Sequence, residues 1–233
     1  MADLTPTGYL AIYALLGGIL PALFWLWFWV QEDKLHPEPR GRILFAFWGG
    51  MLAVPFVYPL EKFVAGHFGM TGTTLVLWAL IEEVAKYGAA WATALRTKAY
   101  DEPIDALEYL ITAALGFAAL ENALFILNPL IDGDAAGSLV AGNLRFIGAS
   151  LLHVVSSGVL GYFIGREFYR SFGWKVAGRI VGLALAVGLH ALFNVFIIYE
   201  NGSKTFLVFA CVWVAALGIL LLFERIKKIT AKE

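Results

Sequence analysis

The chain has 233 residues, of which 60% are hydrophobic and 15% charged, and its formal net charge is −1. A soluble domain has about 45–50% apolar and about 25% charged residues, so the composition excludes an ordinary soluble domain and indicates a polytopic membrane protein. The single cysteine, Cys211, excludes an intramolecular disulfide and a thiolate metal cluster. The net charge identifies no partner, and we expect none among nucleic acids. Because residues 1–6 lack a basic segment, we expect no cleavable signal peptide.

Seven apolar segments are long enough to cross a bilayer, which requires roughly 20 residues each. They predict an all-α fold in which residues 1–233 form a single transmembrane helical domain with a polar site inside the bundle. The connections Gln31–Arg42 and Asn128–Gly137 are rich in helix-breaking residues. The predicted helices span residues 8–30, 43–65, 71–96, 104–128, 139–168, 176–200 and 205–225.

Basic residues alternate between the connections. One side of the predicted bundle has only Lys62 and Lys204. The positive-inside rule therefore places the C-terminus in the cytoplasm and the N-terminus outside the cell membrane, an arrangement that seven spans satisfy. The basic residues of the other side are Lys34, Arg40, Arg42, Arg96, Lys98, Arg166, Arg170, Lys175, Arg179, Arg225, Lys227, Lys228 and Lys232.

A few polar residues remain inside the predicted spans, although a charge at the helix centre costs about 2.5–3.5 kcal/mol on insertion scales. At 1.5 Å per residue, the acidic residues and histidines of four helices fall between the midplane and the outer half of the bilayer. This shared level predicts one polar cavity between the four helices. The residues are Glu82, Glu83 and Lys86 on the third helix, Glu121 and Asn122 on the fourth, Arg145 and His153 on the fifth, and His190 and Asn194 on the sixth.

The spacing within these helices suggests individual roles. Lys86 lies three and four residues after the two glutamates and can pair with either. Glu82 and Glu83 point about 100° apart, so one can face a cavity while the other pairs or braces a neighbouring helix. His190 and Asn194 share a helix face and can both donate to one oxygen, as an oxyanion site requires.

These motifs, in this order, resemble those of the PrsW family of intramembrane proteases, which is related more distantly to the type II CAAX prenyl proteases. The resemblance extends from about residue 20 to residue 200. The matching segments are Glu82-Glu-Val-Ala-Lys86, Phe117-Ala-Ala-Leu-Glu121 with Asn122, His153, and His190-Ala-Leu-Phe-Asn194, together with His36-Pro-Glu-Pro-Arg40 and Pro103-Ile-Asp-Ala. Where the family has Asp or Asn at the end of the last motif, this chain has Asn194.

The resemblance implies an enzyme, a membrane hydrolase that cleaves a membrane-tethered, single-span protein in the manner of the first cut of an anti-sigma factor. We expect Glu82 or Glu83 to act as general base. The predicted catalytic set also contains Glu121, His153, His190 and Asn194, with Lys86 and Asn122 in support. Arg145 is expected to be a helix–helix hydrogen-bond partner.

Two mechanisms remain open. In one, His153, His190 and Glu121 hold a zinc ion with one position left for water. In the other, which we prefer slightly, glutamate and His153 activate water without a metal while His190 and Asn194 hold the oxyanion. Asn194 favours the second, because an amide is a poor zinc ligand.

Other functions compete with proteolysis. Intramembrane Glu, His and Lys also occur in proton relays, so a small proton-coupled secondary transporter is an alternative, although no inverted repeat or interrupted helix is evident. A processing enzyme for prenylated peptides is a second alternative. A scaffold without chemistry is a third, and it leaves the polar cluster unexplained. The oligomeric state does not follow from the sequence.

Overall fold

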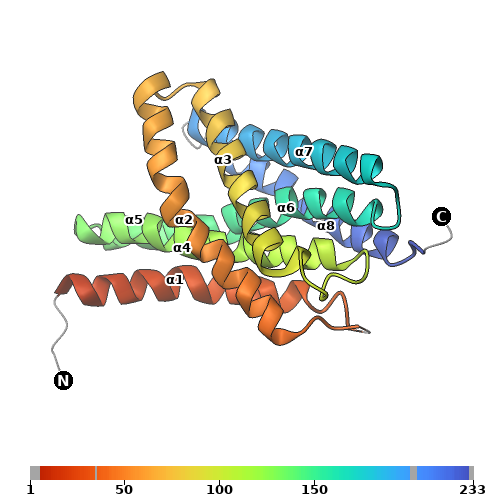
Figure 1. Cartoon of the computed structure of the whole chain (residues 1–233). Coiled ribbons are helices and arrows are strands. Elements are labelled where there is room, and N and C mark those ends of the chain that lie inside the picture. The colour runs from red at the N-terminus through yellow and green to blue at the C-terminus, as the bar shows by residue number, and fades with distance from the viewer. Residues whose placement is uncertain (1–5, 35, 200–203, 231–233) are drawn as a thin grey trace.

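The computed structural model describes residues 6–34, 36–199 and 204–230, and within these ranges every regular element is helical (Figure 1). The first five residues, the last residue of the sixth predicted span and the predicted cytoplasmic Lys232 lie outside the described residues. The elements are α1 (Pro6–Trp29), α2 (Arg40–Phe68), α3 (Gly72–Ala90), η1 (Trp91–Leu95), α4 (Asp105–Ile131), α5 (Ala135–Leu144), η2 (Arg145–Ala149), α6 (Ser150–Arg166), α7 (Phe172–Tyr199) and α8 (Thr205–Ile226).

These elements make seven continuous helical segments. The π-helical turn η1 extends α3, and the π-helical turn η2 joins α5 to α6. Six segments are long and apolar enough to cross a membrane. The exception is α3, because three of its 19 residues, Glu82, Glu83 and Lys86, are charged. The prediction of an all-α, multi-pass membrane protein with seven helices is confirmed.

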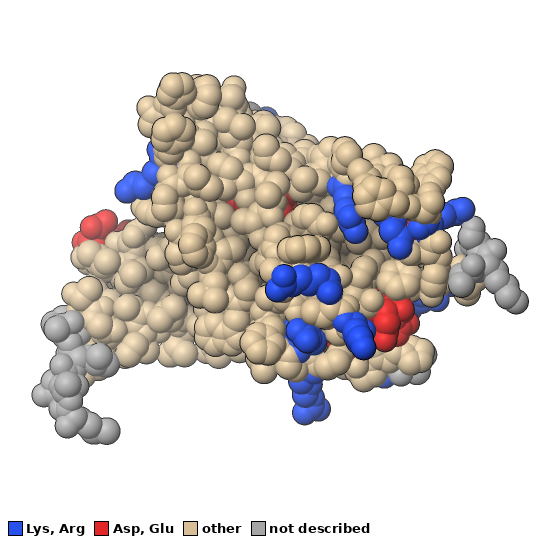
Figure 2. All heavy atoms as spheres, viewed as in Figure 1, with Lys and Arg blue, Asp and Glu red and all other residues tan. Residues whose placement is uncertain are grey.

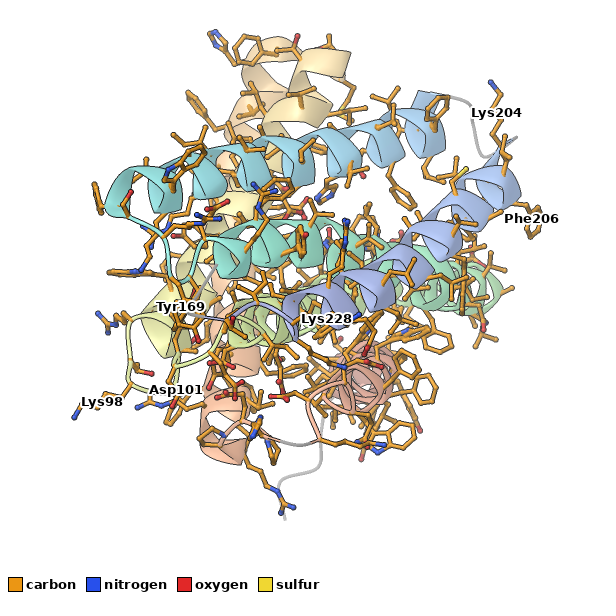
Figure 3. The ribbon with its side chains drawn as sticks, turned by 90° about the vertical axis from the view of Figure 1, so that its right-hand side faces the viewer. Lys98, Asp101, Tyr169, Lys204, Phe206 and Lys228 are labelled. Carbon is orange, nitrogen blue, oxygen red and sulfur yellow. The ribbon has the colours of Figure 1, made fainter. Side chains whose placement is uncertain are left out.

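Helix α4 forms the centre of the bundle. Its residues 105–119 are all buried, which means that neighbours surround it. It packs against α1, α2, α3, α5 and α6, and α2 crosses it steeply (Figure 1). The remaining helices pack around this core. Figure 3 shows α8 with Phe206 near its first residue and Lys228 just after its last.

The crossing of α2 and α4 depends on two glycines. A Cβ atom on Gly50 would collide with the carbonyl oxygen of Ala113 in α4, and a Cβ atom on Gly116 would collide with the carbonyl oxygen of Phe47 in α2. Small residues allow this close backbone approach in membrane helices, where van der Waals packing takes over the role of the hydrophobic effect. The contact fixes where α2 lies along α4.

The outside of the bundle suits a lipid environment. Large apolar side chains are exposed on several helices, among them Phe56, Phe63 and Leu221. Figure 2 shows a surface that is mostly neither acidic nor basic, with Lys and Arg gathered toward the side where the C-terminus lies. This pattern is typical of a multi-pass membrane protein.

We expect Gly50→Ala and Gly116→Ala to lower the thermal unfolding temperature of the detergent-solubilised protein. Each added methyl group meets backbone atoms that cannot rotate away, and overpacking of this kind costs about 1–3 kcal/mol. The matched control is Gly66→Ala in α2, where a Cβ atom meets nothing within 4 Å. Equal unfolding temperatures for all three variants would show that the crossing is not close-packed.

Candidate active site

Glu83 is the most heavily bonded carboxylate of the site. Thr71 caps the start of α3 by accepting a hydrogen bond from the Thr74 amide, and the helix then carries Glu83 to full burial. Its carboxylate accepts hydrogen bonds from side chains of three helices. The donors to Oε1 are Lys86 Nζ at 2.6 Å, Ser156 Oγ at 2.8 Å and His190 Nδ1 at 2.8 Å, and Ser157 Oγ donates to Oε2 at 3.1 Å.

The preceding residue, Glu82, has a different environment. Its side chain is buried, yet Oε2 has no hydrogen-bond partner among the described residues. That oxygen lies 3.7 Å from His190 Nε2, 3.9 Å from His153 Nδ1 and 3.8 Å from Lys86 Nζ. Two adjacent carboxylates therefore differ sharply: Glu83 is saturated with donors, and Glu82 is available to a ligand or a water.

His153 links the two halves of the site. Lys86 Nζ lies 2.9 Å from its Nδ1, and Glu121 Oε2 lies 3.1 Å from its Nε2. Because an ammonium group can only donate, this geometry assigns the ring proton to Nε2, which donates to Glu121. The His153 and His190 rings meet edge to face at 5.2 Å.

Glu121 is held from η2, through Arg145, and from α6, through His153. Arg145 forms an ion pair with its Oε2 and donates through Nε to Asn122 Oδ1, and Asn122 Nδ2 donates to Ser150 Oγ at 3.0 Å. Arg145 begins the π-helical turn η2, a feature that is often found at functional sites. These contacts match the helix–helix role expected of Arg145.

A cavity of about 470 Å³ lies over these groups. Its exposed lining residues come from α2, α4 and α7, among them Tyr58, Phe125 and Ile198. Its volume is within the range of ordinary ligand sites, about 300–1,000 Å³. The polar residues that line it are Glu61, Lys62, Glu82, Glu121, Asn128, Arg145, His153, His190 and Asn194.

The structure thus brings together the groups that the sequence placed at one level, from α3, α4, α6 and α7. Their catalytic roles remain predictions. Sequence reasoning missed Glu61, which stands beside Lys62 near the end of α2 and resembles a charge at a membrane surface. It also missed Ser156 and Ser157, whose spacing of three and four residues from His153 was the available signal.

One group of three residues could hold a metal ion in this cavity. Glu82, His153 and His190 each offer a ligand atom, and these atoms lie within 4.8 Å of one another. The expected third ligand, Glu121, is instead engaged by Arg145 and His153. Buried carboxylates and histidines around a cavity in a helical membrane bundle define a candidate intramembrane hydrolase.

Comparison with known proteins identifies the family. Residues 38–221, most of the chain, match the family model described as PrsW family intramembrane metalloprotease. The chain belongs to this family and is therefore a protease. The match includes every residue of the candidate site and confirms the resemblance seen in the sequence.

Individual proteins of this family are also similar to the chain. The protein named Protease PrsW from Oceanobacillus iheyensis is 24% identical over 207 residues, which cover 86% of this chain and 91% of the relative. Protease PrsW from Bacillus subtilis is 23% identical over 76% of this chain and 79% of its own length. The relative from Geobacillus kaustophilus, also named Protease PrsW, is 26% identical, and the alignment spans 64% of each chain. No solved structure matches the chain.

Replacing Lys86 by Met should strongly destabilise the fold. The substitution leaves the Glu83 carboxylate buried without its lysine, and breaking one side of a buried ion pair costs about 3–5 kcal/mol. Thermal unfolding in detergent measures the effect, and the double variant Lys86→Met/Glu83→Gln should recover part of the loss. Lys62→Met, at an exposed position, is the control. If Lys86→Met unfolds at the wild-type temperature, the pair does not support the bundle.

Proposed function

We propose that the chain hydrolyses a peptide bond of a single-span, membrane-tethered protein, as in the first cut of an anti-sigma factor. The observation that carries this proposal is the Glu82 carboxylate, which is buried, unpartnered at Oε2 and exposed to a cavity that also contains two histidines. A peptidase needs such a group to act on water, and donors to stabilise the oxyanion. The substrate would enter where exposed residues of α2, α4 and α7 line the cavity.

The site lies toward the end of the bundle that has few basic residues. Glu82 is ten residues after the start of α3, about 15 Å along the helix. We infer that this end is extracytoplasmic, with the C-terminus in the cytoplasm of a cell membrane, because the other connections contain the basic residues. Cleavage then takes place in the outer half of the bilayer.

The residues fit the metal ion that the family description implies. Glu82 Oε2 is a buried oxygen without a donor, and His190 Nε2 faces it while His190 Nδ1 is held by Glu83. A carboxylate that orients a histidine from behind is the usual outer shell of a metal site. Glu82, His153 and His190 would hold the ion, and Glu82 takes the place in this set that the sequence suggested for Glu121. A bound zinc ion supplies Lewis-acid polarisation of a carbonyl and acidifies water.

In this scheme Glu121 is the general base, since it lines the cavity beside His153. Its carboxylate takes a proton from water as the water oxygen attacks the carbonyl carbon of the scissile bond. Asn194, which also lines the cavity, donates to the resulting oxyanion. The proton then passes to the amine nitrogen as the C–N bond breaks. Glu83 holds His190 through Nδ1, and Glu121 holds His153 through Nε2. Lys86, which contacts His153 Nδ1 in this structure, would have to turn away for that nitrogen to hold the ion.

A second, metal-free scheme is favoured by one observation: both ring nitrogens of His153 already have partners, Lys86 and Glu121. Glu82 then acts as the base, and Asn194 donates to the oxyanion. His190 Nε2 can donate to it only as an imidazolium, because its Nδ1 already donates to Glu83. The two schemes use the same cavity and differ in the role of Glu82, which binds the metal while Glu121 is the base in the first scheme and is itself the base in the second.

Glu82→Gln should abolish cleavage in either scheme, because the amide neither accepts a proton from water nor binds zinc well. We expect a loss of about a hundredfold or more in proteoliposomes that contain a labelled single-span substrate, with little change in unfolding temperature. Glu224→Gln, the same substitution at an exposed acid of α8, should retain activity. Wild-type cleavage by Glu82→Gln would contradict the assignment of this site.

Metal analysis of the purified protein separates the two schemes. The zinc-dependent scheme predicts near-stoichiometric metal that is lost in His190→Ala, and chelation should remove both metal and activity. Substoichiometric metal in a fully active protein would rule out the zinc-dependent scheme and leave the metal-free one.

A further inference from the structure

A second polar cluster lies at the opposite end of α4, where six carboxylates meet. They come from the connection between α1 and α2, the connection between η1 and α4, and the first turn of α4. Asp105 precedes Glu121 by 16 residues, about 24 Å along the helix, so this cluster is separate from the candidate active site. The six residues, here called the acidic cluster, are Asp33, Glu38, Asp101, Glu102, Asp105 and Glu108.

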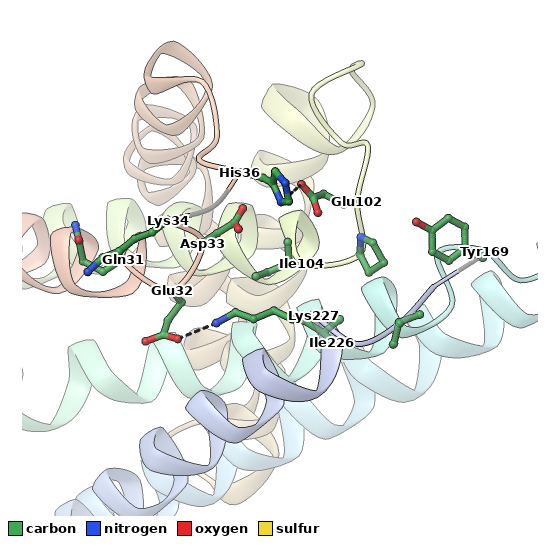
Figure 4. Close-up of a pocket in the computed structure, with 12 residues that line it drawn as sticks. Gln31, Glu32, Asp33, Lys34, His36, Glu102, Ile104, Tyr169, Ile226 and Lys227 are labelled. Atoms are coloured by element: carbon green, nitrogen blue, oxygen red, sulfur yellow. Dashed lines mark hydrogen bonds and ion pairs between the residues drawn. The ribbon is translucent and has the colours of Figure 1, made fainter. Parts of the chain in front are cut away.

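The carboxylates are close enough to share a ligand. One oxygen each of Asp33, Glu102 and Asp105 lie within 4.8 Å of one another. A second set, Glu38, Asp101 and Asp105, satisfies the same condition and shares Asp105 with the first. Figure 4 shows Asp33 and Glu102 at the edge of an adjoining pocket, and Figure 3 places Asp101 on the connection before α4.

Three of these side chains are buried, and each has one carboxylate oxygen without a donor among the described residues. Asp33, Asp105 and Glu108 are 6%, 0% and 4% exposed, and Asp33 Oδ2, Asp105 Oδ1 and Glu108 Oε2 have no hydrogen-bond partner in the described part of the chain. Leaving a charged group buried and unpaired is costly. The orphan oxygens therefore require a positive ligand or a proton.

The backbone fixes the orientation of the central carboxylate. Asp105 Oδ2 accepts hydrogen bonds from the amides of Asp101 and Glu102, each at 2.9 Å. These two bonds leave Oδ1 for another partner. A carboxylate held in this way by the main chain is preorganised for a ligand, since its rotamer is already set.

Side chains of the protein do not neutralise the cluster. Across the described ranges, no lysine or arginine forms an ion pair with any of its six carboxylates. Lys227, which lines the adjoining pocket, pairs instead with Glu32 and Glu224. His36 Nδ1 lies 3.6 Å from Glu102, but its side chain is 70% exposed. Burial, and next the charge of Glu102, raise the pKa of Asp33 above its ordinary value.

We propose that Asp33, Glu102 and Asp105 form a binding site for a hard divalent cation of the Mg²⁺, Ca²⁺ or Mn²⁺ class. Carboxylate oxygens without thiolate or imidazole ligands are the set that these ions prefer. The adjoining pocket of about 440 Å³ has room for the water molecules that complete their coordination. The ion would join the α1–α2 connection to the start of α4. This inference does not rest on the proposed function.

Titration of the chelator-treated, detergent-solubilised full chain with Mn²⁺, followed by electron paramagnetic resonance of free Mn²⁺, tests the site. We expect saturable binding that Mg²⁺ or Ca²⁺ displaces. Glu102→Gln should weaken it by roughly tenfold or more, because a charged ligand is lost, and Asp33→Asn/Glu102→Gln should abolish it. Bound Mg²⁺ or Ca²⁺ should also raise the unfolding temperature of the wild type.

Two controls separate this site from other sources of binding. Glu32→Gln removes an acid of the same connection that pairs with Lys227 rather than with the cluster, and it should bind Mn²⁺ as the wild type does. His190→Ala should also keep this binding, since His190 belongs to the candidate active site.

Several outcomes would overturn the proposal. One is the absence of saturable Mn²⁺ binding, and another is Mg²⁺-displaceable Mn²⁺ binding that persists when Asp33→Asn/Glu102→Gln is combined with His190→Ala, which removes the candidate active site as its source. If Asp33→Asn raises the unfolding temperature while added cations leave the wild type unchanged, the cluster holds protons and the cation site does not exist.

Discussion

The rest of the site depends on how the buried charge of Glu83 is compensated. A carboxylate at this depth in a membrane bundle is costly, and four donors from three helices offset the cost: Lys86 of α3, Ser156 and Ser157 of α6, and His190 of α7. Each donor that turns away leaves the charge less satisfied. The carboxylate therefore sets the relative positions of α3, α6 and α7, and with them the walls of the cavity.

This compensation also separates the two adjacent glutamates. Because successive residues on a helix point about 100° apart, satisfying Glu83 leaves Glu82 facing the cavity. Lys86 and His190 lie beyond hydrogen-bond distance of Glu82 Oε2, at 3.8 and 3.7 Å. His190 serves both residues: Nδ1 contacts Glu83, and Nε2 faces Glu82. Pairs of titratable groups in contrasting environments are a common basis for divided roles in catalysis. The geometry supports a structural role for Glu83 and a chemical one for Glu82.

The sequence predicted the helices and their polar residues well. The length of an apolar segment, and a charged residue inside it, can both be read locally from the sequence. It could not predict which carboxylate meets the histidines. Helices that are apolar on most faces give no period that fixes their rotation, so Glu121 and Glu82 were equally good neighbours for His153. The π-helical turn at Arg145–Ala149 departs from the 3.6-residue period and directs Arg145 toward Glu121. Glu61 and the acidic cluster looked like ordinary charges at helix ends.

The rotation of α4 decides where both polar clusters lie. Asp105 and Glu121 are 16 residues apart, which at roughly 100° per residue places them about 160° apart around the helix. One therefore faces the α1–α2 connection while the other faces the cavity. The close packing of Gly50 and Gly116 between α2 and α4 prevents the helix from turning. A bulky residue there would misalign both clusters together, although it touches neither of them.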